Sequence, residues 1–218
     1  MTDLRVENLK MVMPDFILTA DAFEVKAGQY LSVEARSGFG KTTLLRGLMG
    51  LQAMDKGTIL LNGARLEKTE AHTRNFGVVF QDQILFSHLN ALDNALFGLK
   101  LRGQVNAQMR EETRKGFQML GMENRLQASI HELSGGERQR LAMLRATLFK
   151  PSCLILDEPL KGLDSKSAAA LMAYLRQFLL SHPVPVIWIS HQGEEPLNGV
   201  RIIGKEQAGQ RHFEFHGR

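Results

Sequence analysis

The run ARSGFGKTT, from Ala35 to Thr43, constrains this chain more than any other segment. It matches the phosphate-binding loop pattern G-x-x-x-x-G-K-[ST] except at the first position, which is Ala35. The strand-like run Tyr30–Val33 precedes it, and leucines at helical spacing follow it. These leucines are Leu44, Leu45, Leu48 and Leu51. The order of strand, glycine-rich turn and helix predicts an α/β core that binds a phosphorylated ligand; the alternative is a glycine-rich turn without a ligand.

The residue types in this loop suit phosphate binding. Gly38 and Gly40 allow the backbone to wrap closely around phosphate oxygens, and the N–H groups at the start of the following helix supply positive potential. The ammonium group of Lys41 can reach the β- and γ-phosphates of a nucleotide, and the hydroxyl group of Thr42 can bind Mg²⁺. Ala35 is compatible with the loop if its φ is negative. The residues predicted to contact the nucleotide here are Arg36, Ser37, Gly38, Phe39, Gly40, Lys41, Thr42 and Thr43.

Two carboxylates follow an apolar run later in the chain, in the sequence LILDEP. Ligands of open parallel sheets bind at the carboxyl ends of the strands, which is where Asp157 and Glu158 would lie. Asp157 is predicted to hold Mg²⁺, directly or through water, and Glu158 to act as general base for the water that attacks the γ-phosphate. Taken alone, the pair could also be the acidic start of a helix. Together with a phosphate loop, the catalytic interpretation is favoured.

The segment LSGGERQR, which begins at Leu133, predicts a second anion site. Ser134 is placed to cap a helix, and Gly135 and Gly136 leave the first N–H groups of that helix uncovered. One nucleotide does not need two such segments in one chain. We therefore expect this segment to face the γ-phosphate of a nucleotide held by a second protomer, in a head-to-tail dimer with a two-fold axis.

At these three segments the chain resembles the nucleotide-binding domains of ABC transporters, and the resemblance covers nearly its whole length. The stretch from Leu85–Asn90 through Phe97–Gly103 resembles bacterial importer subunits most closely. LSGGERQR resembles the signature motif of that family, ARSGFGKTT its Walker A motif with one departure, and CLILDEP its Walker B motif. The resemblance implies that Gln81 contacts Mg²⁺ and the attacking water, that Asp164 belongs to the D-loop, and that His191 is the switch histidine at the γ-phosphate. It implies ATP and Mg²⁺ as cofactors.

Three departures from the family pattern concern nucleotide affinity and communication between the sites more than hydrolysis. The aromatic residue that stacks on adenine should fall near Met13, so stacking is weakened or passes to Phe16. Lys161 stands where the family usually has a small polar residue, and Gln192 follows the histidine where an acidic residue is usual.

The pattern along the chain and the resemblance predict a single α/β domain, residues 1–218. Residues 1–80 and 149–218 would form a P-loop NTPase core with a mostly parallel sheet and an N-terminal antiparallel β subdomain, and residues 81–148 an inserted α-helical subdomain with the signature motif. Cys153–Leu156 and Val186–Ile189 lack polar alternation, as strands buried on both faces do. The other expected elements are strands at 16–18, 57–63 and 75–80, and helices at 43–51, after Asn106 and at 166–180. The tail after Gly199 is not assigned.

Composition restricts the setting of the protein. With 44% apolar and 23% charged residues, the chain fits a globular protein and neither a disordered nor a collagen-like one. No apolar stretch approaches the roughly 20 residues that cross a bilayer, and the N-terminus lacks a signal-peptide core, so a role at a membrane would depend on a partner. The single cysteine, Cys153, lies in an apolar run, which fits a packed side chain in a reducing compartment. The net charge of +4 is dispersed and selects no partner.

We therefore expect a cytoplasmic ATPase, peripheral on the cytoplasmic face of the inner membrane, that energises solute transport. Its expected partners are a second copy or a like subunit upon ATP binding, membrane permease subunits and, in an importer, an external solute-binding protein. The alternatives are an ABC ATPase acting on nucleic acid or ribosomes, which usually has two cassettes or a coiled-coil insertion, and a nucleotide-dependent assembly factor, against which Glu158 and His191 argue. Nucleic acid is not an expected partner. Neither the cargo nor the direction of transport is encoded in this chain.

A group of apolar residues follows Gln81 closely: Ile84, Leu85, Phe86 and Leu89. We expect them to be exposed together and to form a groove for a short helix of the permease. The alternative is that they pack inside the helical subdomain.

Overall fold

The structure is a computed structural model that describes residues 3–190, 199–207 and 209–216. The chain divides into two compact units. The first comprises Met1–Phe76, Ser152–Leu156 and Pro183–Arg218, and the second comprises Gly77–Pro151 and Asp157–His182. None of the helices in the described part of the chain combines the length and apolar character that crossing a membrane requires.

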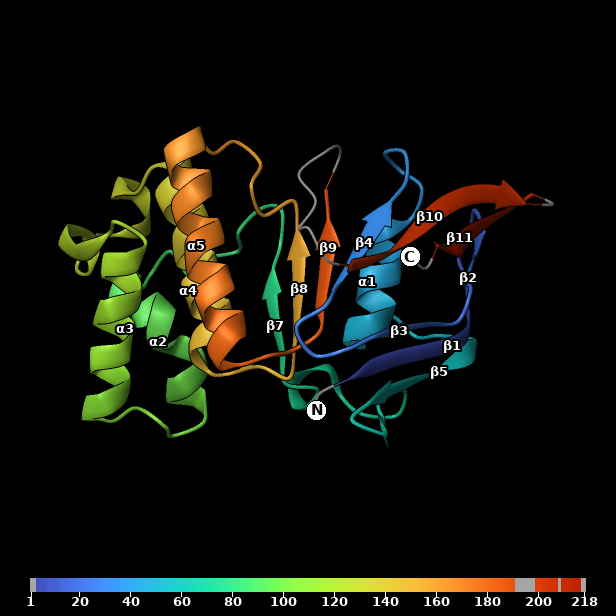
Figure 1. The fold of residues 1–218 in the computed structure, drawn as a ribbon, viewed down its shortest axis with the longest axis horizontal. Coiled ribbons are helices and arrows are strands. Elements are labelled where there is room, and N and C mark those ends of the chain that lie inside the picture. The colour runs from blue at the N-terminus through green and yellow to red at the C-terminus, as the bar shows by residue number, and fades with distance from the viewer. Residues whose placement is uncertain (1–2, 191–198, 208, 217–218) are drawn as a thin grey trace. The chain divides into compact units, whose positions relative to one another are not determined.

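The first unit consists of a twisted sheet and the helix α1, which spans Lys41–Met49 (Figure 1). A short 3₁₀-helix, η1, spans Ala71–Thr73. The strands are β1 (Leu4–Val12), β2 (Ile17–Ala20), β3 (Phe23–Val25), β4 (Tyr30–Glu34), β5 (Lys56–Leu61), β6 (Ala64–Arg65), β8 (Cys153–Asp157), β9 (Val186–Ile189), β10 (Gly199–Gln207) and β11 (Gln210–His216). Their order in the sheet is β6-β5-β1-β2-β11-β10-β4-β9-β8, and β3 pairs with β1 outside this path.

This sheet has an antiparallel part and a parallel part. Strand β1 pairs antiparallel with β2, β3 and β5, whereas β4 pairs in parallel with both β9 and β10. The C-terminal hairpin joins the two parts, because β11 pairs in parallel with β2 while β10 pairs in parallel with β4. The predicted α/β fold, with parallel strands and an N-terminal antiparallel portion, is confirmed. The tail that the sequence left unassigned forms the connection between the two portions.

Several strand predictions are confirmed at the level of single residues. Every residue of β8 and β9 is buried, as expected for runs without polar alternation. Strands β5 and β6 form a hairpin whose turn residues, Asn62 and Gly63, have φ of 54° and 77°, the left-handed values that an Asn-Gly turn adopts. The strand expected at 16–18 begins one residue later, at Ile17, and β1 and β3 are additions to the predicted set.

Helix α1 begins and ends two residues before the predicted helix at 43–51. Two glycines with positive φ set its limits: Gly40, at 113°, precedes it, and Gly50, at 77°, follows it. The N–H group of Gly50 donates to the carbonyl oxygens of Arg46 and Gly47, which closes the last turn. A Cβ atom on Gly47 would lie 2.8 Å from the sulfur of Met11, so α1 packs very closely on β1.

The second unit is mostly helical (Figure 1). Its elements are β7 (Phe76–Val79), α2 (Ala91–Leu101), α3 (Ala107–Met119), η2 (Glu123–Arg125), η3 (Ile130–Glu132), α4 (Gly135–Leu148) and α5 (Ser165–Ser181). Helix α4 packs against α2, α3 and α5. The predicted cap of α3 is confirmed, because the side chain of Asn106 accepts a hydrogen bond of 2.8 Å from the N–H group of Met109.

Candidate functional site

The loop between β4 and α1 has a backbone shape that suits anion binding. Gly38 has φ of 73°, and a Cβ atom there would meet nothing within 4 Å, so a ligand can approach its backbone. Gly40 has φ of 113°, and a Cβ atom there would lie 2.7 Å from Cδ1 of Leu18. Ala35 is not among the residues with positive φ, so the alanine at the first position of the pattern introduces no strain. The loop thus retains its glycines at the two positions where the backbone needs them.

Lys41 lies against the inside of this loop. Its side-chain nitrogen Nζ donates to the carbonyl oxygens of Ala35, at 2.6 Å, and Arg36, at 3.3 Å, and the residue is only 9% exposed. Thr42, in the first turn of α1, is exposed, and Thr43 is half-buried. A cation is therefore present where the loop amides and the N-terminus of α1 already create positive potential.

The C-terminal hairpin packs against the loop between β4 and α1. The ring of Phe39 is 3% exposed and packs edge-on against Phe213, with 5.3 Å between the ring centroids. A Cβ atom on Gly204 would lie 2.5 Å from Cε1 of Phe39, and Arg36 forms an ion pair with Glu206. Any contribution of Phe39 to a bound phosphate would come from its backbone, because its side chain anchors the loop to the hairpin.

The predicted catalytic carboxylates follow β8. Figure 1 shows β4, β9 and β8 pointing in the same direction, so the carboxyl ends of β4 and β8 lie at the same edge of the sheet of the first unit. Asp157, the last residue of β8, is 9% exposed, and Glu158 is 7% exposed. Glu158 has φ of 49°, a value that few residues with a Cβ atom adopt and that occurs often at functional sites.

Lys161, one of the departures from the family pattern, contacts the predicted general base directly. Its Nζ atom lies 2.5 Å from Oε2 of Glu158, and its backbone N–H group donates to the carbonyl oxygen of Glu158 at 3.1 Å. The lysine side chain is 57% exposed, whereas the glutamate side chain is 6% exposed. The ammonium group of an exposed lysine is therefore paired with a largely buried carboxylate.

The segment LSGGERQR forms the start of α4. The hydroxyl oxygen of Ser134 accepts from the N–H group of Glu137 at 3.1 Å, and Oε2 of Glu137 accepts from the N–H group of Ser134 at 2.8 Å, which is a capping box. Burial acts to raise the pKa of Glu137, but the hydrogen bonds from Ser134 and the ion pair with Arg125 leave this pKa lowered. Ser134 and Gly135 are exposed and Gly136 is half-buried. The predicted second anion site is thus an open helix N-terminus at the protein surface.

Helix α4 is bonded to the segment that follows the carboxylates. Nε2 of Gln139, which is 2% exposed, donates to the carbonyl oxygen of Pro159 at 2.9 Å. The guanidinium group of Arg140 donates to the hydroxyl oxygen of Ser167. Asp164 caps α5, with both carboxylate oxygens accepting hydrogen bonds from Ser167, and these bonds lower the pKa of Asp164. Within the second unit, the signature segment and the predicted D-loop residue therefore belong to one bonded network.

The loop after Gln81 is held by two polar side chains, Arg145, which is half-buried, and Asn94, which is buried. Gln81 itself is exposed. The guanidinium group of Arg145 donates to the carbonyl oxygens of Gln83, at 3.2 Å, and Ile84, at 2.8 Å, and burial lowers the pKa of Arg145. Asn94, which is 0% exposed, bonds the backbone on both sides of the turn at residues 86–90. These hydrogen bonds fix the shape of the loop.

The expected apolar patch near Gln81 is only partly exposed. Ile84 is 54% exposed, but Leu85, Phe86 and Leu89 are half-buried. The ring of Phe86 packs on Phe97, with 4.1 Å between the ring centroids. The expectation that all four residues are exposed together is wrong, because Phe86 forms part of the packing of the helical unit.

Several oxygen donors are chemically suited to Mg²⁺. The Thr42 hydroxyl, the Asp157 carboxylate and the Gln81 amide supply the hard oxygen ligands that this ion prefers. The predicted switch histidine, His191, and the neighbouring Gln192 lie outside the described residues.

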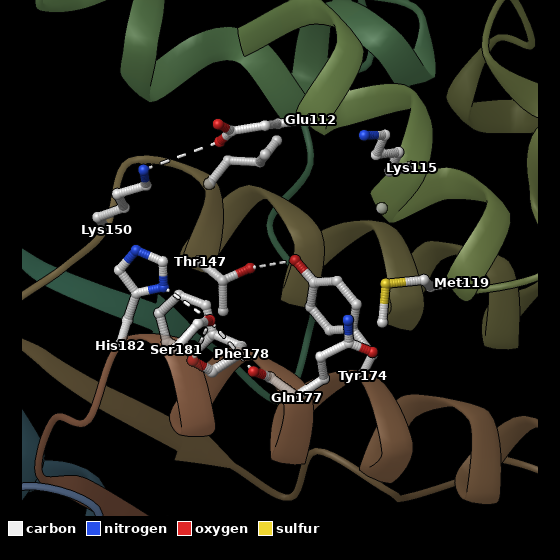
Figure 2. A pocket seen from close by; sticks show the side chains of 12 residues that line it. Glu112, Lys115, Met119, Thr147, Lys150, Tyr174, Gln177, Phe178, Ser181 and His182 are labelled. Carbon is white, nitrogen blue, oxygen red and sulfur yellow. Dashed lines mark hydrogen bonds and ion pairs between the residues drawn. The ribbon is translucent and has the colours of Figure 1, made fainter. Parts of the chain in front are cut away.

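A cavity of about 210 Å³ lies among α3, α4 and α5 in the second unit (Figure 2). On one side, Lys150 and Glu112 face each other at 3.9 Å. Across the cavity the hydroxyl groups of Thr147 and Tyr174 are 2.7 Å apart, and burial raises the pKa of Tyr174 to about 12. Its lining contains none of the predicted site residues, so it does not belong to the candidate site.

Comparisons with known proteins identify relatives of this chain. The family model described as "ABC transporter" matches residues 18–161. The spermidine/putrescine import ATP-binding protein PotA of Bacteroides fragilis is 36% identical over 79% of this chain and 38% of its own length. The sulfate/thiosulfate import ATP-binding protein CysA of Nephroselmis olivacea is 36% identical over 91% of this chain and 58% of its own length. The molybdate/tungstate import ATP-binding protein WtpC of Pyrococcus horikoshii is 33% identical over 93% of this chain and 60% of its own length.

The chain thus spans between 38% and 60% of the length of these three relatives. A solved structure described as the ATP binding subunit of an ABC transporter has a TM-score of 0.81 and 23% sequence identity, and the match covers 92% of this chain and 85% of that chain. At that identity the likeness concerns the fold.

Proposed function

The chain belongs to the ABC transporter family, and from that premise we propose that it binds and hydrolyses MgATP, as an ATP-sandwiched dimer, to energise solute transport through a separate membrane permease. The observation that carries this proposal is the loop between β4 and α1. Its left-handed glycines, Gly38 and Gly40, and the inward ammonium group of Lys41 form a cradle for the β- and γ-phosphates.

In the proposed ground state the loop binds the phosphate chain of ATP. The N–H groups of residues 36–43 donate to phosphate oxygens, and Lys41 supplies the point charge against the β- and γ-phosphates. Thr42, Asp157 and Gln81 would hold Mg²⁺, which neutralises charge on the phosphates when bound.

In the proposed hydrolytic step, water adds to the γ-phosphorus atom while the bond to the bridging oxygen of ADP breaks. Glu158 accepts the proton of that water, and His191 contacts the γ-phosphate. The ammonium group of Lys161 is paired with Oε2 of Glu158 and would compete with the proton for this carboxylate. The left-handed backbone at Glu158 supports a functional role for this side chain.

The second half of each site would come from a partner protomer. Ser134 and the N–H groups of Gly135 and Gly136 are open to the solvent, so they can face the γ-phosphate of a nucleotide held by the partner. The hydroxyl oxygen of Ser134 accepts from the helix, which leaves its own O–H group able to donate to that phosphate. When the dimer closes, Asp164 would transmit the change to α4 through its hydrogen bond with Ser167 and the hydrogen bond of Ser167 with Arg140.

We place the protein at the cytoplasmic face of the inner membrane, bound to permease subunits and, in an import system, working with an external solute-binding protein. The three relatives bear names that refer to polyamines, sulfate and molybdate, so similarity does not select one cargo. The proposed organisation is one ATPase domain in which residues 81–148 form the helical subdomain. No nucleic acid takes part in this proposal.

Two substitutions test the proposal. Lys41→Ala should abolish ATP hydrolysis and raise the dissociation constant for MgATP at least tenfold, because it removes the charge inside the loop. Glu158→Gln keeps the shape of the side chain but removes the base, so this variant should bind MgATP, fail to hydrolyse it and accumulate as a dimer. Lys56→Ala, which removes an exposed lysine from the first unit, is the matched control.

The measurements are equilibrium binding of MgATP, phosphate release, and light scattering coupled to size-exclusion chromatography with and without MgATP. Normal ATP turnover in Lys41→Ala would contradict the assignment of this loop as a phosphate-binding loop. A Glu158→Gln protein that binds MgATP yet stays monomeric at every concentration would refute the sandwich.

A further inference from the structure

We propose that Arg211, on the C-terminal hairpin, and Phe16, at the β1–β2 turn, together form the surface on which the adenine ring of the nucleotide stacks. This inference rests on the proposed function, because it assumes that the loop between β4 and α1 holds the phosphates of ATP. It adds a residue from β11 to a site that the motifs alone place on β4, α1 and β8.

Phe16 is the aromatic side chain beside the open part of the loop. The turn that carries it is closed by a hydrogen bond of 2.8 Å from the N–H group of Met13 to the carbonyl oxygen of Phe16. A Cβ atom on Gly40 would lie 3.5 Å from Cε2 of Phe16, so the phenyl ring sits at the N-terminus of α1. The ring is half-buried, whereas Phe39 and Phe213 are 3% and 0% exposed. Phe16 is therefore better placed to meet a base than the two buried rings are.

Arg211 covers this ring and contacts the loop at the same time. Its guanidinium carbon Cζ lies 3.8 Å from the centroid of the Phe16 ring, which is a close cation–π contact. Its Nη1 atom donates to the carbonyl oxygen of Gly38 at 2.9 Å. The guanidinium group is thus fixed between the glycine that opens toward the phosphates and the ring beside α1.

The sheet fixes the position of Arg211 relative to Phe16. In the parallel pair of β11 and β2, Arg211 lies opposite Leu18, two residues after Phe16. The next residue, His212, has its Nδ1 atom 2.9 Å from the hydroxyl oxygen of Thr19 and its Nε2 atom 3.1 Å from Oδ1 of Asp21. These side-chain contacts hold the register of β11 on β2, and with it the register of Arg211.

The flat guanidinium group of Arg211 offers a stacking surface, which the residue at position 13 lacks. A methionine stands where an aromatic ring would stack on adenine, and a single phenyl ring half-buried under an arginine offers limited free surface. Guanidinium planes stack on nucleic-acid bases as well as on aromatic rings. A base that rests on the Arg211–Phe16 pair would gain the stacking surface and would have its phosphates within the loop.

The test compares MgATP with magnesium tripolyphosphate, a probe that has the phosphates but no base. Both dissociation constants are measured by isothermal titration calorimetry for the wild type, Arg211→Ala, Arg211→Lys and the control Lys205→Ala. The control removes a cation from the same hairpin, Lys205, which forms an ion pair with Glu214. Arg211→Lys keeps a positive charge and a donor for Gly38 but has no flat face.

We expect Arg211→Ala and Arg211→Lys each to weaken MgATP binding about tenfold, in line with the worth of a base-stacking contact, while tripolyphosphate affinity changes less than twofold. Lys205→Ala should match the wild type for both ligands. Unchanged MgATP affinity in either Arg211 variant would overturn the proposal. Equal losses for both ligands would also overturn it, because Arg211 would then act by shaping the loop at Gly38. A wild type that binds tripolyphosphate but not MgATP, or neither ligand, would instead refute the proposed function.

Discussion

Arg74 is a buried cation whose removal should destabilise the first unit. The residue is 4% exposed, and its guanidinium group donates to the carbonyl oxygen of Leu48, at 2.6 Å, in the last turn of α1. It also donates to the carbonyl oxygen of Thr69 from Nε and Nη2, at 3.3 and 3.1 Å. Burial lowers the pKa of Arg74, and the nearby Glu67 carboxylate acts in the opposite direction. The side chain thus closes the C-terminal end of the helix that begins at the phosphate loop.

The substitution Arg74→Met keeps most of the length of the side chain and removes every donor. The carbonyl oxygens of Leu48 and Thr69 then lose this partner, at a cost of about 1–3 kcal/mol each. The variant no longer buries a guanidinium group, which offsets part of that cost. We therefore expect a net loss of about 3 kcal/mol, which corresponds to a fall in Tm of roughly 6–12 °C for a chain of this size.

The single cysteine provides the assay. Cys153 is 0% exposed in β8, and burial raises the pKa of its thiol far above the usual range. A thiol reagent should therefore label it only when the first unit, which also contains Arg74, opens. Labelling is followed as a function of urea concentration, and with a slope of about 2–3 kcal/mol/M the midpoint should fall by about 1 M or more.

Arg46→Met is the control, because Arg46 lies in the last turn of the same helix but is exposed. Its free energy of unfolding should differ from that of the wild type by no more than about 0.5 kcal/mol. A loss below about 1 kcal/mol in Arg74→Met, or equal losses in the two variants, would refute the argument that buried carbonyl groups depend on this guanidinium group.

Two further predictions concern hydrolysis and docking. Lys161→Ser removes the ammonium group from Oε2 of Glu158, so phosphate release per dimer should rise about three- to tenfold at saturating MgATP. A rise of this size is expected when roughly 1 kcal/mol of ion pairing is removed from the base. A slower rate would mean that the lysine positions the carboxylate. Ile84→Glu places a charge on the exposed apolar residue beside Gln81, so recovery in the membrane fraction of native cells should fall at least tenfold while basal hydrolysis changes less than threefold. Leu180→Glu, at another exposed apolar residue, should retain membrane recovery. Membrane recovery of Ile84→Glu equal to that of the wild type would place docking elsewhere.

The phosphate loop was predictable from sequence because its requirements are local. Left-handed glycines, an inward lysine and a helix start all lie within a few residues of one another. Strand β1 escaped prediction because its alternation changes phase at a bulge. Asn8 has φ of 51°, and the pairing register with β5 shifts between Glu7 and Lys10. The apolar residues on either side of this bulge therefore do not follow one continuous period of two.

The C-terminal hairpin escaped prediction for a different reason. Most residues of strands β10 and β11 are half-buried or exposed, and both strands carry charged side chains. Its place in the sheet depends on pairing with β4 and β2, which are distant in sequence. No short-range signal encodes such pairing. The contacts of Arg211 and Glu206 with the loop follow from this pairing, so sequence reasoning could not find them.

Two cationic side chains contact residues that are proposed to act on the nucleotide. Lys161 contacts the predicted base, and Arg211 contacts Phe16 and the loop at Gly38. A side chain that holds the nucleotide equally before and during the reaction, as the proposed stacking on Arg211 would, tightens binding without accelerating the chemical step. A cation paired with the base competes with the proton that the base must accept. In the proposed function, the two cations would therefore tighten nucleotide binding more than they accelerate hydrolysis.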